Sequence, residues 1–115
     1  MTHIEEINTG LPLSATEAIN QVLRQHPTIT TALLYGSRAM GTFREGSDID
    51  LTLTGETSYN ELQKIEQELD DLLLPYKIDL SLMKDIDNTE LLEHIHRVGV
   101  EFYQRCPPSR SSYTD

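Results

Sequence analysis

Two aspartates spaced two residues apart, within residues 33–53 (LLYGSRAMGTFREGSDIDLTL), constrain this chain more than any other feature. They follow an apolar run, a Gly-Ser pair and a ten-residue segment that is mostly polar and contains two glycines, and they open a strand-like segment. Because side chains alternate between the two faces of a strand, Asp48 and Asp50 share one face, whereas Ile49 and Leu51 share the other. Two carboxylates ~4–5 Å apart repel by roughly 3–4 kcal/mol at an effective dielectric constant near 20. Either one carboxylate takes up a proton or a divalent cation lies between them.

The apolar periodicity predicts an α/β domain in which helices and strands alternate. A helical spacing of apolar residues predicts helices over residues 14–26, 58–74 and 88–98, with a short turn at RAMG. Runs of β-branched and apolar residues predict strands over residues 28–35, 48–54 and 77–82, with a further short strand over 100–103.

Helix starts can be predicted from capping patterns. Ser14 with Glu17 forms one capping box and Ser58 with Glu61 a second, and an Asp-Asn pair at residues 87–88 is expected to cap the last helix. We expect the apolar faces of the helices to point into the core, including these residues: Ile19, Leu23, Leu62, Ile65, Leu69, Leu72, Leu73, Leu91, Leu92, Ile95 and Val98.

A third aspartate lies on the polar face of a predicted strand. In residues 77–82 (KIDLSL), alternation places Asp79 opposite the apolar side chains, although aspartate is depleted in strands. If three helices cover the apolar face of the sheet, the other face stays open, and Asp48, Asp50 and Asp79 all lie on it. Three carboxylates on neighbouring strands suit an in-line displacement at two metal ions ~3.5–4 Å apart.

The Gly-Ser pair, Gly36 and Ser37, lies where a predicted strand passes into a short helical turn. Such a junction exposes backbone N–H groups, and glycine lets an anion approach closely, although an ordinary tight turn has the same pattern. Arg38 and Arg44 are candidates to neutralise phosphate, with solvated surface arginines as the alternative.

Three residues near these motifs are interpreted as non-catalytic. His94 and His96 lie ~200° apart around their helix, so they cannot bind one metal together. Tyr35 is interpreted as packing at the end of its strand.

Length and charge narrow the class of protein. A chain of 115 residues predicts one domain over residues 14–105, between an N-terminal extension (1–13) and a flexible tail (106–115). The net charge of −10 disfavours nucleic acid as a partner. The single cysteine, Cys106, fits a reducing compartment, and the sequence shows neither a membrane span nor a signal peptide, so we expect a cytoplasmic protein.

Taken together, GSRAxG followed by SDIDL, with Asp79 on a later strand, resembles the DNA polymerase β-like nucleotidyltransferase superfamily. The string is most similar to its minimal nucleotidyltransferase (MNT) branch, small proteins paired with a HEPN-domain partner in toxin–antitoxin systems. The resemblance covers about residues 15 to 104. It implies an α/β (α+β) fold with a small mixed sheet, helices packed on one face and an open polar catalytic face.

The resemblance also implies the roles of individual residues. Gly36 and Ser37 would hold the phosphates of a nucleotide, with Arg38 and Ser47 as further nucleotide-binding candidates. The metal ligands and catalytic residues would be Asp48, Asp50 and Asp79, which would bind two Mg²⁺ ions, the second arriving with the nucleotide. The implied reaction transfers AMP, or another nucleoside monophosphate, from ATP or another NTP to a hydroxyl of a HEPN toxin, which is thereby neutralised.

Two other functions remain open on the sequence. The chain can be a non-catalytic, nucleotide-binding antitoxin that masks its partner sterically. A nucleotidyltransferase acting on a small molecule is the other alternative, but larger members that do so append a domain to hold the acceptor.

Overall fold

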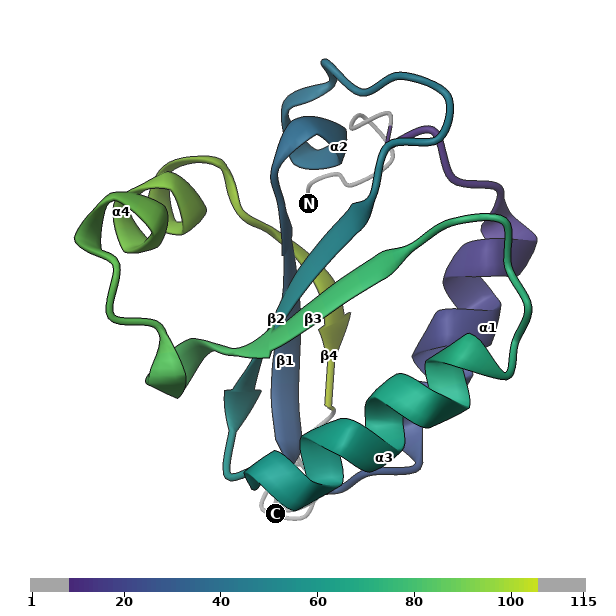
Figure 1. The fold of residues 1–115 in the computed structure, drawn as a ribbon, viewed down its shortest axis with the longest axis vertical. Coiled ribbons are helices and arrows are strands. Elements are labelled where there is room, and N and C mark those ends of the chain that lie inside the picture. The colour runs from purple at the N-terminus through teal and green to yellow at the C-terminus, as the bar shows by residue number, and fades with distance from the viewer. Residues whose placement is uncertain (1–8, 106–115) are drawn as a thin grey trace, which may run out of the picture.

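The computed structural model describes residues 9–105, so the predicted tail over 106–115, with Cys106, lies outside the described residues. Helices and strands alternate in the predicted order (Figure 1). The elements are α1 (Leu13–Arg24), β1 (Ile29–Tyr35), α2 (Ser37–Met40), β2 (Ile49–Gly55), α3 (Tyr59–Asp70), β3 (Ile78–Leu82), the 3₁₀ helix η2 (Met83–Asp85), α4 (Thr89–Val98) and β4 (Val100–Gln104). The predicted short strand near the C-terminus is confirmed as β4.

The strands form one mixed sheet in the order β3-β2-β1-β4. β1 pairs antiparallel with both β2 and β4, whereas β2 and β3 are parallel. Parallel neighbours need a crossover connection, which here contains α3. The register sets Asp50 opposite Asp79 on one side and opposite Tyr35 on the other.

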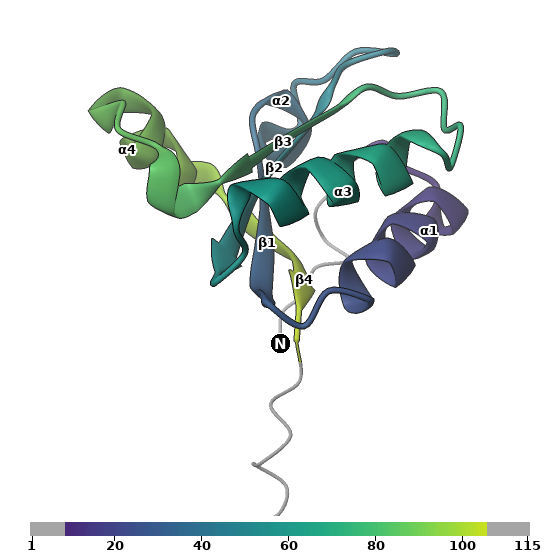
Figure 2. The ribbon, with the colours of Figure 1, turned by 60° about the horizontal axis from the view of Figure 1, so that its bottom comes forward.

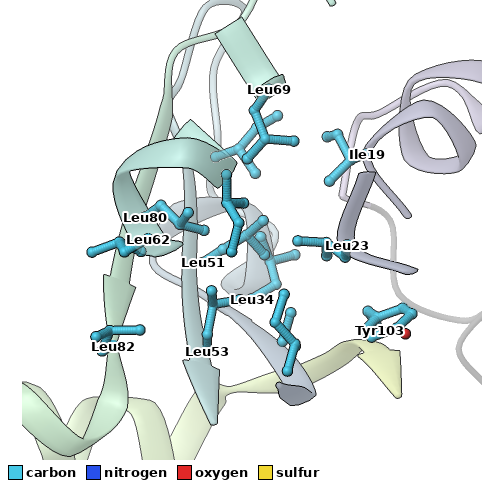
Figure 3. Packing of buried hydrophobic residues seen from close by; sticks show 14 residues of the cluster. Ile19, Leu23, Leu34, Leu51, Leu53, Leu62, Leu69, Leu80, Leu82 and Tyr103 are labelled. Carbon is cyan, nitrogen blue, oxygen red and sulfur yellow. The ribbon is translucent and has the colours of Figure 1, made fainter. Parts of the chain in front are cut away.

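The hydrophobic core lies between one face of the sheet and helices α1 and α3 (Figures 2 and 3). Alternation along β2 and β3 turns leucines toward these helices, as predicted. The buried core side chains are Ile19, Leu23, Ile29, Ala32, Leu34, Ile49, Leu51, Leu53, Leu62, Ile65, Leu69, Leu80, Leu82 and Tyr103. The polar residues that alternate with them therefore lie on the opposite face.

Two predictions about helix ends are wrong. Pro12, not Ser14, is the N-cap of α1, because the Pro12 carbonyl accepts the N–H groups of Ala15 and Thr16. α3 ends at Asp70, and Leu73 beyond it has a left-handed backbone (φ 56°) and an 87% exposed side chain. Leu73 is therefore not part of the core. By contrast, the Ser58 and Asn88 caps are confirmed, since their side chains accept the N–H groups of Glu61 and Leu91.

The prediction that three helices share one face is wrong for α4. Figures 1 and 2 show α4 on the opposite side of the sheet from α1 and α3. Its one fully buried residue is Ile95, and the predicted inward residues Leu91, Leu92 and Val98 are only half-buried. α4 thus lies beside the polar face that we expected to be open.

His26 links the loop after α1 to helix α3. Its side chain is nearly buried, with Nδ1 3.0 Å from Glu61 Oε2 and Nε2 2.7 Å from Glu68 Oε1. Burial alone lowers the pKa of His26, but the hydrogen bonds to Glu68 and Glu61 outweigh it and raise the pKa above its usual value. The hydrogen bond between His26 and Glu61 lowers the pKa of Glu61.

Among residues 9–105, no helix has both the length and the apolar character needed to span a membrane.

Candidate active site

The three aspartates lie on or beside the polar face of the sheet. Asp50 on β2 and Asp79 on β3 are direct neighbours in the parallel register, so their side chains leave the same face side by side. Asp48 lies one residue before β2. The side chains of Asp48 and Asp79 are exposed, and that of Asp50 is half-buried. None of the three points into the α1/α3 layer.

Asp50 has the perturbed electrostatics expected of the central carboxylate. Burial raises its pKa above the usual value, and the nearby charges of Asp79 and Asp48 raise it further. A positive charge on His94 of α4 would act in the opposite direction. A positive charge beside Asp50 would therefore be favourable.

The side chains of the candidate site have the donor atoms that a divalent cation needs. Carboxylate oxygens are the ligands that Mg²⁺ prefers, and the repulsion that raises the pKa of Asp50 would be relieved by a cation. However, within residues 9–105 the side chains, as they stand, do not bring three His, Cys, Asp or Glu residues into a group that could hold a metal. The donor chemistry fits, and the exposed carboxylates of Asp48 and Asp79 would have to turn toward Asp50.

The Gly36 turn lies directly against Asp50. Gly36 has φ 79° and ψ −158°, a conformation almost restricted to glycine. A Cβ atom at this position would overlap the Asp50 carboxylate, so only glycine lets the backbone pass this close. The next two residues, Ser37 and Arg38, are the first of α2, where main-chain N–H groups have no partner within the helix. The structure therefore brings the Gly-Ser motif and the acidic motif together.

The Arg38 side chain is buried and engaged within the protein, contrary to the predicted contact with phosphate. It is 2% exposed, and its Nε and Nη2 donate to the carbonyl of Ser47 at 3.1 and 3.0 Å. Nη1 donates to the carbonyl of Thr9 at 2.7 Å, and the guanidinium lies 5.1 Å from the Phe43 ring centre and 5.0 Å from that of Tyr76. Arg38 thus ties together the segments around the turn.

Ser47 shapes the loop between α2 and β2. Its Oγ accepts the N–H of Arg44 at 2.8 Å, and its carbonyl accepts Arg38. These bonds hold the loop that delivers Asp48 to the site. A contact of Ser47 with nucleotide stays a prediction.

Tyr35 and His94, which the sequence analysis interpreted as non-catalytic, lie against the candidate site. Tyr35 is buried on the same face as the aspartates, and burial raises its pKa, with Asp79 and Asp50 adding to the rise. The His94 ring contacts Tyr35 edge-on, with centroids 6.1 Å apart, and its Nε2 accepts the N–H of Gly36 at 3.1 Å. The alternation of β1, which sets Tyr35 on the face opposite Leu34, was the available signal for Tyr35; none existed for His94.

The family follows from the sequence match, and the fold agrees with it. The family described as Polymerase beta, Nucleotidyltransferase matches residues 17–107, most of the chain. The chain therefore belongs to the polymerase beta nucleotidyltransferase family. A search of the curated proteins finds no significant match.

Several solved structures share the fold at low sequence identity. A toxin–antitoxin complex with AMP-PNP superposes with a TM-score of 0.64 at 21% identity, over 84% of this chain and 78% of that one. The structure of a tri-AMPylated Shewanella oneidensis HEPN toxin with its MNT antitoxin gives 0.60 at 19% identity, over 81% and 72%. A putative nucleotidyltransferase from Sulfolobus solfataricus gives 0.52 at 19% identity, over 88% and 86%. The predicted fold class is confirmed.

Proposed function

We propose that this protein is a Mg²⁺-dependent nucleotidyltransferase that transfers AMP, or another nucleoside monophosphate, from an NTP to a hydroxyl of a partner protein. The hydroxyl oxygen loses its proton and bonds to the α-phosphorus, and pyrophosphate leaves. The partner proposed is a HEPN-type toxin, which the modification neutralises. The observation that carries this proposal is the register of Asp50 beside Asp79, with the Gly36 turn packed against Asp50. The family match and the similarity to structures of MNT antitoxins support it.

Each part of the proposed site has a chemical task. Asp48, Asp50 and Asp79 would hold Mg²⁺, and the turn at Gly36 and Ser37 would bind phosphate oxygens through the backbone N–H groups that open α2. Bound Mg²⁺ supplies neutralisation of the phosphate charge and a lower pKa for the acceptor hydroxyl. The exposed side chains of Asp48 and Asp79 leave this side of the site open to solvent, so a second chain can bring its hydroxyl group to them.

Charge supports a protein acceptor. The net charge of −10 favours encounter with a basic protein and disfavours nucleic acid. A basic toxin that handles RNA would carry the opposite net charge and is therefore a suitable partner.

One observation favours the non-catalytic alternative, in which the protein masks its partner and only binds nucleotide. The side chains described in residues 9–105 do not form a ready group of three metal ligands. Under the proposed function, the exposed carboxylates converge on the metal when nucleotide binds; under the alternative they do not.

The experiment that separates these functions is an intact-mass measurement on the co-purified partner. After incubation with Mg²⁺ and ATP, we expect the partner's mass to rise by one or more AMP groups. The double variant Asp48→Asn/Asp50→Asn, purified with the same partner, should give no increase. A partner that stays unmodified by the wild type, with GTP, CTP and UTP tested as well, would refute transfer and leave masking.

A further inference from the structure

Helix α4 reaches the candidate site through one side chain, His94. This helix lies on the polar side of the sheet, away from α1 and α3, and packs mainly on β1 (Figure 2). Ile95 is its one buried residue, and the adjacent His94 is half-buried against the end of β1. The contact is therefore local, between one side chain and the Gly36 turn.

The His94 contact has a defined chemistry. Nε2 accepts the main-chain N–H of Gly36 at 3.1 Å through its ring lone pair. The ring meets Tyr35 edge-on, at an interplanar angle of 81°, which fixes its orientation. His94 thus contacts both residues at the point where the strand becomes the turn.

The other sides of Gly36 are also occupied. Its carbonyl accepts the N–H groups of Ala39 and Met40, each at 3.1 Å, and its Cα lies against the Asp50 carboxylate. With the N–H of Gly36 bound to His94, the first N–H groups that remain to face an anion are those of Ser37 and Arg38. A shift of the Gly36 peptide would move these donors relative to Asp50.

We propose that His94 is a positioning residue for nucleotide binding: by accepting the Gly36 N–H, it holds the turn so that the N–H groups of Ser37 and Arg38 lie beside the metal-binding carboxylate. The inference rests on the proposed nucleotide site and adds to it a residue from α4. His94 itself need not touch the nucleotide.

The test compares variants of His94 in binding of Mg²⁺–ATP by isothermal titration calorimetry. His94→Leu removes the acceptor, and we expect the dissociation constant to rise about fivefold, the effect of one lost hydrogen bond. His94→Gln places an amide oxygen near the position of Nε2, and we expect it to restore most of the affinity. His96→Leu, on an exposed position of the same helix, should bind as the wild type does.

Two further measurements separate positioning from a purely structural role of His94. If His94 only stabilised the packing of α4, any change that loosens α4 would weaken nucleotide binding. Ile95→Val loosens the packing of α4 without removing the bond to Gly36, so it should lower the unfolding midpoint and leave the dissociation constant unchanged. In the free protein, exchange of the Gly36 amide hydrogen should be slow in the wild type and in His94→Gln but fast in His94→Leu, as measured by ¹H–¹⁵N NMR.

Three results would overturn the inference. Unchanged affinity of His94→Leu for Mg²⁺–ATP would show that the turn keeps its conformation without His94. Tighter binding would show that His94 competes with phosphate for the N–H of Gly36. Fast exchange of the Gly36 amide in the wild type would show that the bond is absent in solution. A wild type that binds no nucleotide would instead refute the proposed function, and the positioning role with it.

Discussion

The close approach of Gly36 to Asp50 gives the sharpest test of how the site is built. Replacing Gly36 with alanine imposes two costs. The backbone at φ 79° and ψ −158° is about 2–3 kcal/mol unfavourable for a residue with a side chain. In addition, the new Cβ overlaps the Asp50 carboxylate, which must move.

Gly41 provides a control with little steric conflict. It has φ 80° and ψ 10°, and a Cβ there would meet nothing within 4 Å. Gly41→Ala should therefore lower the free energy of unfolding by about 1 kcal/mol, the ordinary cost of the left-handed region. Gly36→Ala should lower it by more and abolish binding of Mg²⁺–ATP, whereas Gly41→Ala should still bind.

A double-mutant cycle separates the steric part from the backbone part. In the Asp50→Ala background the carboxylate is gone, so Gly36→Ala keeps only its backbone cost. Urea unfolding of the four proteins should give a coupling free energy of about 1 kcal/mol or more between the two positions. Additive effects, within about 0.5 kcal/mol, would refute the argument that glycine is needed here because of Asp50.

Three further changes test other parts of the molecule. Asp48→Asn/Asp50→Asn should raise the metal-free unfolding free energy and abolish transfer. The reason is that the partly buried charge of Asp50 and its repulsion by Asp48 are removed. A less stable variant would mean that these carboxylates have structural partners. The pKa of His26 is raised in the folded state, so its contribution to stability is complete below pH 6.5 and declines as the pH rises through the higher folded value; urea unfolding should show this decline in the wild type and not in His26→Gln. Arg38→Met leaves the carbonyls of Ser47 and Thr9 without their buried donor, and we expect a loss of about 2–3 kcal/mol in the same assay, whereas a neutral effect would contradict its place in the structure.

The shared face of Asp50 and Asp79 was predictable because it depends on alternation along each strand and on the helix that connects the two strands. The period of two along β2 and β3 sets Asp50 and Asp79 opposite the leucines that face the core, and α3 between the strands makes them parallel. The Gly-Ser motif was informative because of its position: it directly follows the last residue of a buried strand.

The position of α4 was not predictable from its pattern. An amphipathic spacing shows which side of a helix is to be buried, but not against which surface. Leu91, Leu92 and Val98 have the spacing of a core helix, yet they are half-buried on the polar side of the sheet, and His94 thereby reaches Gly36. Nothing in the local sequence distinguishes His94 from the exposed His96.

Arg38 shows a second limit of local patterns. An arginine two residues after the glycine of this motif suggests a contact with phosphate. Its guanidinium lies 5.1 Å from the ring centre of Phe43, in the loop directly after α2, and 5.0 Å from that of Tyr76, which comes from a segment distant in sequence. Only the fold brings these residues together.

The most direct test of the account is the stability of the wild type with Mg²⁺ and ATP compared with EDTA and ATP. If the carboxylates and the Gly36 turn form one metal–nucleotide site, ligand at roughly 100-fold over its dissociation constant should raise the unfolding free energy by ~2–3 kcal/mol. Asp50→Asn should show no such rise. An unchanged unfolding transition of the wild type at millimolar Mg²⁺ and ATP would contradict the central claim.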